Sequence, residues 1–432
     1  MKKLLILLTL IFVFLFALTS CGEDDGELSG DTVTINVYNW GEYISDGFQG
    51  SIDSNAEFEK YCAEVLKKKV KVNYTTYANN EDMYSKLKSG AGTYDIVIPS
   101  DYMIQKMIEE DMLLAFDANS IENYKYISDA FKKNYFDEDE MYSVPYTYGM
   151  MGVIYNTALV DPEDYEKQSW DLLWNPKYKG KILQFNNPRD AFGTAMYFTG
   201  LDINSTDKNV WLSALETLSK QKSLVQGYVN DEIFNKMTTA SAAIAPYYAG
   251  DFITMAEQNE DLDFFYPKEG TNYFIDAMCI PKNANHPDLA KEYINFMLTE
   301  EIAVANAVYI GYASPNTLVV NGDYVNESYL EEMGEDAIEI LYKASPAEIN
   351  KEYNAKHGTT CYKSFTPEIQ AHVNALWESL KTENSTELWV HIATAVIVTG
   401  VAVLVGYTTF IKKKRSRDYR LRDKAARLQK NK

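Results

Sequence analysis

The sequence predicts an α/β protein with two lobes, each a mostly parallel sheet flanked by helices, plus one C-terminal transmembrane helix. Three observations carry this prediction. About 350 of the 432 residues lie between two apolar terminal segments, more than one hydrophobic core usually organises. Strand-type and helix-type periodicities alternate along this central part. An apolar run near the C-terminus is long enough to cross a bilayer and is followed by a basic tail.

The N-terminal residues have the layout of an export signal. Two lysines precede the apolar run Leu4–Leu18, the order of charge and hydrophobicity that such signals share. The run ends in Leu-Thr-Ser-Cys-Gly, which resembles the bacterial lipobox. We therefore expect residues 1–20 to be a lipoprotein signal peptide, Cys21 to carry a lipid, and 21–31 to be a linker. The alternatives are an uncleaved anchor and a signal that ends in cysteine by chance.

The segment Leu388–Ile411 is predicted to be the transmembrane helix. It has about the 20 apolar residues that a bilayer core requires, and His391 is its single side chain that ionises near neutral pH. The basic tail 412–432 follows directly, so the positive-inside rule places the tail in the cytoplasm and the central part outside. A buried core helix is a weaker interpretation, because only a charged tail follows.

The central part is strongly acidic. The whole chain has a formal net charge of −21, although both ends are basic. Such a charge disfavours nucleic-acid partners and raises the local concentration of small cations, but it does not define a site. Solubility explains much of the charge equally well.

Cysteine and histidine give no sign of a disulfide framework, a metal site or a cofactor. Besides Cys21 the chain has three cysteines, an odd number that cannot all pair within one chain. The four histidines do not combine with them in a metal-ligand spacing. These residues are Cys62, Cys279, Cys361, His286, His357, His372 and His391.

Strands and helices alternate in chain order through the central part. Val33, Ile35 and Val37 alternate with polar residues, which predicts a strand, and 71–74 predicts a second strand after the helical segment 58–68. Strands joined by helices favour largely parallel sheets covered on both faces. The same rhythm returns at 96–98, 181–185, 242–245, 263–266 and 278–281.

Aromatic and acidic residues recur together where these strands end. In open α/β sheets, ligands bind beyond the carboxyl ends of the strands. Packing or solvation explains any one such segment, whereas their joint recurrence indicates a binding site. The segments are 38–43, 99–102, 186–190, 246–251 and 273–276.

This combination suits an elongated polycation with an apolar middle. Aromatic faces pack against methylene groups and attract ammonium groups, each contact contributing on the order of 0.5–2 kcal/mol. Carboxylates bind the charged ends through charge-assisted hydrogen bonds, and a buried carboxylate without a partner is penalised. The same acids would therefore provide affinity and selectivity.

Six motifs occur in order at Val37–Tyr43, Tyr94–Ser100, Val144–Tyr146, Leu173–Gly180, Pro267–Gly270 and Ile310–Asn316. Together they resemble the spermidine/putrescine-binding proteins of polyamine ABC importers, and the resemblance covers residues 33–316. It implies a type II periplasmic-binding-protein-like clamp with the ligand in the cleft. Lobe 1 would comprise 32–148 and 274–313, and lobe 2 would comprise 149–273 and 314–383.

The resemblance also implies roles for single residues. Trp40, Tyr43 and Tyr102 would form aromatic walls on the first lobe, with Glu42 and Ser100 as polar contacts beside them. The opposite lobe and the crossings between lobes would contribute the remaining ligand contacts. These are Asp190, Tyr248, Asp251, the pair Phe274 and Asp276 around one ammonium, and Tyr312, which closes over the ligand.

Some positions depart from the family pattern. Asn187 stands where spermidine-preferring members carry an acid, and Tyr248 stands where tryptophan is usual. Phe274 and Asp251 are similar to the putrescine-preferring type, whereas Glu42 is similar to the spermidine type. The preferred polyamine therefore stays open between putrescine and spermidine.

The resemblance implies a monomeric binding protein that captures polyamine and delivers it to an ABC permease by lobe closure. We expect no enzyme activity, because the chain has no nucleophile elbow, zinc-protease motif or phosphate-binding loop. A secreted carbohydrate hydrolase is a remote alternative, since paired carboxylates and aromatics also occur in sugar sites. A membrane-tethered polyamine sensor without transport is the nearer alternative.

The predicted location is the cell membrane, with the binding domain on the extracytoplasmic side. The lipid at Cys21 and the helix at 388–411 would hold the protein there. The tail at 412–432 would contact the anionic inner leaflet or the cytoplasmic parts of the importer.

Overall fold

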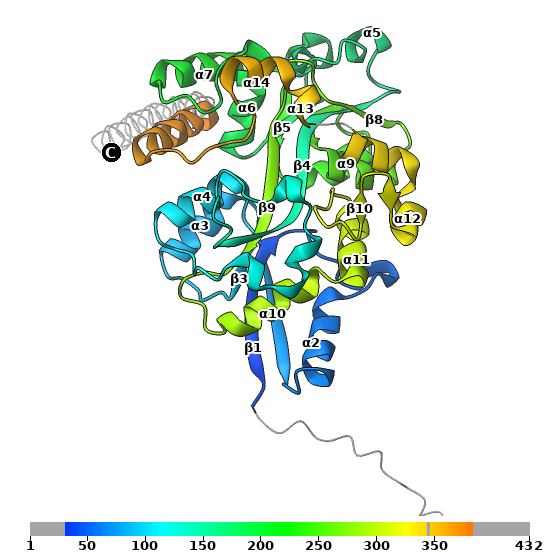
Figure 1. Ribbon diagram of the computed structural model, residues 1–432. Coiled ribbons are helices and arrows are strands. Elements are labelled where there is room, and N and C mark those ends of the chain that lie inside the picture. Colours follow the sequence, from blue (N-terminus) through cyan, green and yellow to red (C-terminus); the bar gives the residue numbers. More distant parts are fainter. Residues whose placement is uncertain (1–30, 344–345, 383–432) are drawn as a thin grey trace, which may run out of the picture. The chain divides into compact units, whose positions relative to one another are not determined.

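The computed structural model describes residues 31–343 and 346–382. The chain divides into two compact units. The first unit comprises the chain up to Asn204 and Leu224–Ser364, and the second comprises Ser205–Ser223 and the chain from Phe365 onward. The first unit contains a nine-stranded sheet, in which eight strands follow the order β2-β1-β3-β9-β4-β7-β5-β6 and β8 pairs with β4 (Figure 1).

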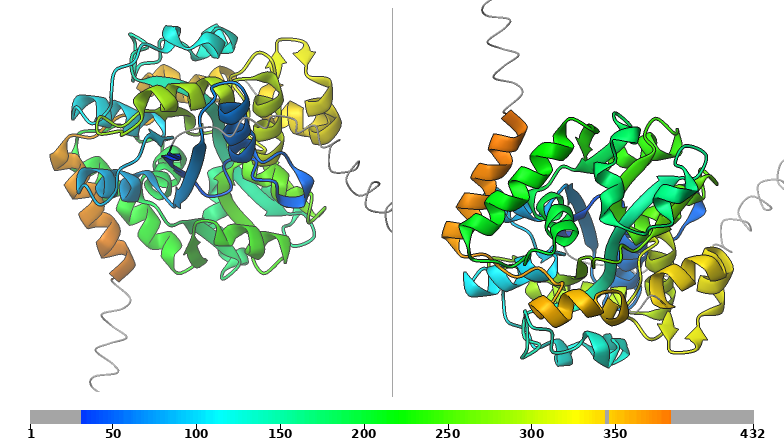
Figure 2. Two further views of the ribbon diagram at one scale, coloured as in Figure 1. Left: turned by 90° about the horizontal axis from the view of Figure 1, so that it is seen from below. Right: turned by 90° about the horizontal axis from the view of Figure 1, so that it is seen from above.

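One end of this sheet belongs to the first lobe and is parallel. β1 (Val33–Trp40) pairs with β2 (Val70–Tyr77) from Val33↔Val70 to Trp40↔Tyr77, and with β3 (Ile96–Val97) on its other side. Ile35 and Val37 are fully buried, as the predicted alternation requires. Helices flank the strands on both faces (Figure 2). They are α2 (Ser54–Glu64), α3 (Asn80–Lys88), α4 (Asp101–Glu109), α10 (Pro287–Met297) and α11 (Glu300–Ile310).

The other end belongs to the second lobe. Here β5 (Ile182–Phe185) pairs in parallel with β6 (Val225–Val229) and β7 (Ile244–Tyr248). β8 (Leu262–Phe265) pairs with β4 in the opposite direction. The helices of this lobe are α5 (Pro162–Tyr165), α6 (Pro188–Thr199), α8 (Glu232–Thr238) and α9 (Ala249–Ala256).

Two strands join the lobes, β4 (Ser143–Asn156) and β9 (Tyr273–Cys279), which pair antiparallel to each other. A third connection lies beside them, where the backbone N–H of Tyr148 donates to the carbonyl of Ala313 at 3.0 Å. The sequence predicts mostly parallel sheets, and the outer strands follow this prediction. The pairings of β4 and β9 are antiparallel because these strands carry the chain between lobes rather than through βαβ units.

The remaining segments of the first unit are short. Tyr324–Val325 (β11) pairs with Val320–Asn321 (β10). Further helical elements are α12 (Glu327–Ile338), α13 (Pro346–Ile349), α14 (Lys351–His357) and the π-helix η7 (Glu339–Lys343). The 3-10 turns are η1 (Phe48–Gly50), η2 (Ala118–Ser120), η3 (Glu122–Tyr126), η4 (Asp129–Phe131), η5 (Trp170–Trp174) and η6 (Pro176–Tyr178).

The described part of the second unit contains α7 (Lys208–Lys222) and a helix over 367–382. The sequence predicts one apolar face on the latter. Ile369, Val373 and Leu380 are buried, whereas Leu376 is half-buried. Both helices belong to the second unit, whereas the nine-stranded sheet with its two lobes belongs to the first unit.

The predicted fold class requires one correction, which concerns its transmembrane helix. Within residues 31–343 and 346–382, every helix is too short or too polar to cross a membrane. The predicted helix at 388–411, the tail at 412–432, the signal at 1–20 and Cys21 all lie outside the described residues. The fold that the described residues support is the two-lobed α/β clamp.

Candidate ligand-binding site

A cavity of about 100 Å³ lies where strands of both lobes end. β1 leads into Trp40 and Gly41, and β3 leads into Ser100 at the start of α4. In the second lobe, β5 leads into Asn187, and β7 leads into Tyr248. The site thus occupies the carboxyl ends of parallel strands, where open α/β sheets bind ligands.

The structure brings together ten of the eleven predicted contact residues in the lining of this cavity. Glu42 is the exception. Its backbone has a left-handed φ of 52° in the turn after β1, and its exposed side chain lines a neighbouring groove instead. The ten are Trp40, Tyr43, Ser100, Tyr102, Asp190, Tyr248, Asp251, Phe274, Asp276 and Tyr312.

The lining is acidic. It contains six carboxyl side chains and one guanidinium, that of Arg189, which packs against the rings of Tyr102 and Tyr362 with centroid distances of 5.1 and 4.3 Å. A cation that enters this cavity meets a strongly favourable field. The acids are Glu81, Asp101, Asp190, Asp231, Asp251 and Asp276.

Asp276 is only 3% exposed and uses one of its two carboxyl oxygens. The Tyr43 hydroxyl donates to Oδ2 at 2.7 Å, and the Thr147 hydroxyl lies 2.6 Å from that of Tyr43. Oδ1 accepts no hydrogen bond from the described residues. Burial raises the pKa of Asp276 to about 6, and the nearby hydroxyls of Ser100 and Tyr43 oppose this shift.

Asp251 stands at the first turn of α9 and is closed over by Tyr312. The Tyr312 hydroxyl donates to Oδ2 of Asp251 at 2.6 Å. Burial raises the pKa of this carboxyl to about 7, although the bond from Tyr312 favours the ionised form. Asp231 also lines this part of the cavity, and burial raises its pKa too.

Asp190 is hydrogen-bonded to Asn187, the N-cap residue of its own helix. Asn187 caps α6, because its Oδ1 accepts the backbone N–H of Asp190 at 2.9 Å. Its amide nitrogen and the Tyr248 hydroxyl donate to Oδ2 of Asp190 at 2.8 and 2.6 Å. Burial raises the pKa of Asp190, against the effect of these two donors. The predicted acid and the position before the Pro-Arg pair thus form one hydrogen-bonded unit.

Ser100 and Tyr102 share a polar network with α3. Asn80 donates from Nδ2 to the hydroxyl of Ser100 at 3.0 Å and to that of Tyr102 at 3.2 Å. The Tyr102 hydroxyl donates in turn to Oε1 of Glu81 at 3.0 Å. These contacts orient both predicted residues before any ligand arrives.

The aromatic rings of the lining pack edge to face. Tyr43 and Tyr312 have centroids 5.3 Å apart at 76°, and Tyr248 and Phe274 are 5.4 Å apart at 76°. Trp40 approaches Tyr43 at 6.5 Å and 62°. Such contacts stabilise ring positions beyond simple burial, so the walls of the cavity are preorganised.

Sequence reasoning missed several lining residues. Asp101 and Tyr247 lie inside segments already singled out for aromatic and acidic content, so that signal could have found them. Glu81, Asp231 and Tyr362 lie outside those segments, and no local pattern marks them. Only the tertiary structure brings them to the cavity.

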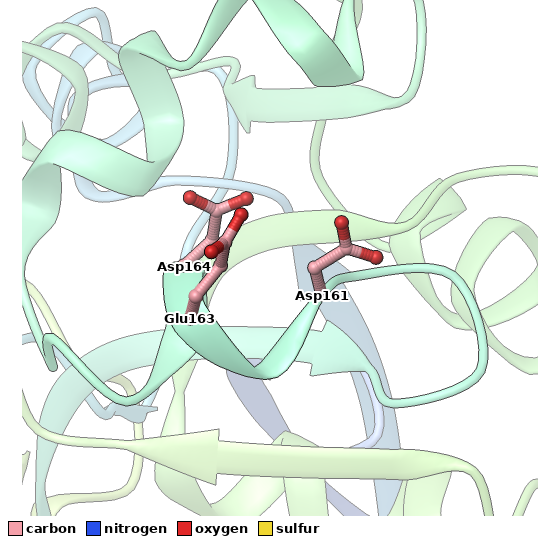
Figure 3. A group of neighbouring side chains, drawn as sticks. All are labelled: Asp161, Glu163 and Asp164. Carbon is pink, nitrogen blue, oxygen red and sulfur yellow. The ribbon is translucent and has the colours of Figure 1, made fainter.

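Among the described residues, a second acidic group has carboxylate oxygens that lie close enough together to hold a metal ion (Figure 3). Its members are Asp161, Glu163 and Asp164. The Lys177 ammonium bonds to Asp161, lies 2.9 Å from Oδ2 of Asp164 and is 3.9 Å from Glu163. The hydroxyl of Tyr178 and Lys177 lower the pKa of Asp164 to about 2. This group is an ion-pair network around a lysine.

The chain resembles known proteins over most of its central part. The family described as bacterial extracellular solute-binding protein matches residues 56–329. The spermidine/putrescine-binding periplasmic protein of Escherichia coli is 32% identical over 66% of this chain and 78% of that protein. The putrescine-binding periplasmic protein PotF of the same organism is 25% identical over 67% of this chain and 80% of that protein.

The chain is also similar to solved structures of proteins of this kind. The spermidine/putrescine ABC transporter substrate-binding protein PotD of Streptococcus pneumoniae is 32% identical, with a TM-score of 0.62 over 81% of this chain and 99% of that chain. A protein from Listeria monocytogenes, also 32% identical, gives a TM-score of 0.66 with the same coverage. The two-lobed α/β fold predicted from the sequence is therefore confirmed.

Proposed function

The chain belongs to the bacterial extracellular solute-binding proteins, and from this premise we propose that it captures putrescine, spermidine or both and delivers them to an ABC permease. The names of its relatives support this ligand class and this kind of partner. Binding would occur on the extracytoplasmic side, with the ligand released unchanged. None of the relatives reported above is described as a sensor or a hydrolase, so these alternatives gain no support.

The observation that carries the proposal is a set of buried oxygen atoms without donors. Oδ2 of Asp101, Oδ1 of Asn272 and Oδ1 of Asp276 accept no hydrogen bond from the described residues, and all three residues line the cavity. Proteins pair nearly all their buried polar atoms, because an unpaired one costs about 1–3 kcal/mol. A ligand rich in N–H donors would satisfy these acceptors, whereas a ligand rich in acceptors would not.

The aromatic lining suits the carbon chain of such a ligand. Phe274 and Asp276 alternate along β9 and so share one face of the strand. Asn272 directly precedes the strand, and all three residues line the cavity. Phe274 therefore lies between two polar acceptors and offers a ring to methylene groups or to an ammonium. The alternation of acceptor, ring and acceptor corresponds to the alternation of ammonium and methylene groups in a polyamine.

Capture would proceed by closure of the two lobes. The lining residues come from both lobes and from the joining strand β9. A ligand that contacts both lobes gains its full set of contacts only in the closed form, so it shifts the population toward closure. A permease that distinguishes closed from open forms would then read the presence of ligand.

Attachment to the membrane through a lipid at Cys21 and a monomeric state are further parts of this proposal. The lipobox-like sequence before Cys21 supports the first. The lipid attachment stays a prediction because Cys21 lies outside the described residues. The monomeric state stays a prediction as well.

We expect calorimetry of the purified protein to show binding of putrescine or spermidine and much weaker binding of butylamine. Butylamine has the same four-carbon chain but one ammonium, so it leaves part of the acidic lining without a partner. Losing one charge-assisted contact should weaken binding by at least about thirtyfold. Equal affinity for butylamine, or no binding of either polyamine after removal of any copurified ligand, would contradict the proposed function.

We expect Gly250→Ala to weaken polyamine binding by about tenfold. A Cβ at this position would lie 2.2 Å from Cδ2 of Tyr312, so the ring must move and its bond to Asp251 must change. Gly227→Ala is the matched control, because a Cβ there has no heavy atom within 4 Å. Calorimetry on both variants tests this positioning role. Identical polyamine affinities of the two variants would show that binding does not depend on the position of the Tyr312 ring.

A further inference from the structure

Asp101 is a carboxylate in the cavity that neither the sequence analysis nor the family resemblance assigned to the ligand. It is the first residue of α4 and is only 1% exposed. Its Oδ1 accepts the backbone N–H of Tyr102 at 2.7 Å. Its Oδ2 accepts no hydrogen bond from the described residues. One oxygen of this buried carboxyl is therefore supported by the protein, the other has no donor, and the residue lines the cavity.

The neighbours of Asp101 do not satisfy the second oxygen. Burial raises its pKa well above the ordinary value, opposed by the N–H of Tyr102. The charge of Asp276 adds to the rise, while the guanidinium of Arg189 and the hydroxyl of Tyr135 oppose it. Fold stability alone does not account for such an arrangement, because a buried carboxylate without a full set of donors destabilises the empty protein.

Asp101 lies beside Asp276. The preceding residue, Ser100, forms an antiparallel bridge with Asp276. The N–H of Ala277 donates to the carbonyl of Pro99 at 3.1 Å. The turn into α4 and strand β9 are thus fixed against each other by backbone contacts. Each carboxyl has one oxygen bonded to the protein and one oxygen without a donor.

We propose that Asp101 and Asp276 form a carboxylate pair that binds one ammonium group of the ligand jointly. The inference rests on the proposed function, because it requires a cationic ligand. A primary ammonium has three N–H donors, enough to bond both free oxygens. Its positive charge also relieves the repulsion between the two carboxylates. The pair selects for a charged amine and against a hydroxyl or an amide at this position.

Asp101→Asn tests the role of Asp101 directly. The amide oxygen can still accept the N–H of Tyr102, so the start of α4 is preserved. We expect putrescine and spermidine to bind at least about tenfold more weakly, while the melting temperature of the empty protein stays unchanged or rises. Asp137→Asn is the matched control. That buried carboxyl lies outside the cavity lining and accepts three backbone N–H groups and the Ser143 hydroxyl, so its loss should lower the melting temperature and leave affinity unchanged.

A double-mutant cycle on the full chain tests whether the two carboxylates act together. Calorimetry would measure wild type, Asp101→Asn, Asp276→Asn and the double variant. If both bind one ammonium, the double variant should lose clearly less affinity than the product of the two single losses. Multiplicative losses, or unchanged affinity with a lower melting temperature in Asp101→Asn, would overturn the inference. Failure of the wild type to bind any polyamine would instead overturn the proposed function.

Discussion

Replacing Asp276 by Asn should weaken the binding of both putrescine and spermidine by between about thirtyfold and a few thousandfold. Truncating one partner of a buried charge pair typically costs about 2–5 kcal/mol. The substitution keeps the shape of the side chain and an oxygen that can accept the Tyr43 hydroxyl, so the loss would report the missing charge. Calorimetric titration with each polyamine measures it.

Asp263 provides the matched control for this variant. It accepts a tyrosine hydroxyl, that of Tyr155, at 2.6 Å, as Asp276 accepts that of Tyr43. It is exposed on β8 and does not line the cavity. Asp263→Asn should bind polyamine as the wild type does. Wild-type affinity in Asp276→Asn would remove this carboxylate from the ligand site.

The affinity for polyamine should fall on the order of a thousandfold between pH 8 and pH 5. Burial raises the pKa of Asp251 to about 7 and that of Asp276 to about 6. Because the ligand is cationic, it binds the ionised carboxyls and displaces their protons. The contribution of these two carboxyls to affinity is therefore full above both pKa values and decreases as the pH falls through each of them. Calorimetry at intervals of half a pH unit would resolve this profile.

The two steps of the profile can be assigned by substitution. Asp251→Asn removes the group that titrates near neutral pH, so the remaining loss of affinity should begin nearer pH 6. The polyamine amines stay protonated over this range, so the ligand itself adds no step. An affinity that does not change from pH 8 to pH 5 would contradict the role of these buried carboxyls.

Much of the site could be predicted because its residues follow strands with clear patterns. The alternation in β1 and the apolar run before Ser100 located two strand ends, and the position of a ligand beyond such ends is a property of the fold. Asp190 and Asp251 follow β5 and β7 in the same way. Local sequence was sufficient there, because the chain reaches the cavity directly after a predictable strand.

Other residues reach the site through long-range packing. Tyr362 is far from the remaining cavity residues in sequence, and its hydroxyl donates to the carbonyl of Arg189. Glu81 is bound through the hydroxyl of Tyr102. Neither contact has a signature in local periodicity. Glu42 shows the converse, since its sequence neighbours line the cavity while a left-handed backbone turns its side chain elsewhere.

Hydrophobic periodicity also could not predict the antiparallel pairing of the joining strands β4 and β9. β4 is a 14-residue strand of mostly apolar and aromatic residues, which identifies a buried segment but not its direction or partner. Pairing with β9 depends on contacts more than a hundred residues apart in sequence. The division of 205–223 and the segment after 365 into a separate compact unit depends on the same kind of contact.

A crystal structure of the protein with bound putrescine or spermidine tests the central claim most directly, namely that the buried oxygens without donors are the ligand's contacts. The account predicts an ammonium nitrogen within about 3 Å of Oδ1 of Asp276, with the carbon chain against the ring of Phe274. A polyamine bound elsewhere, or one in the cavity that leaves this oxygen without a donor, would contradict it.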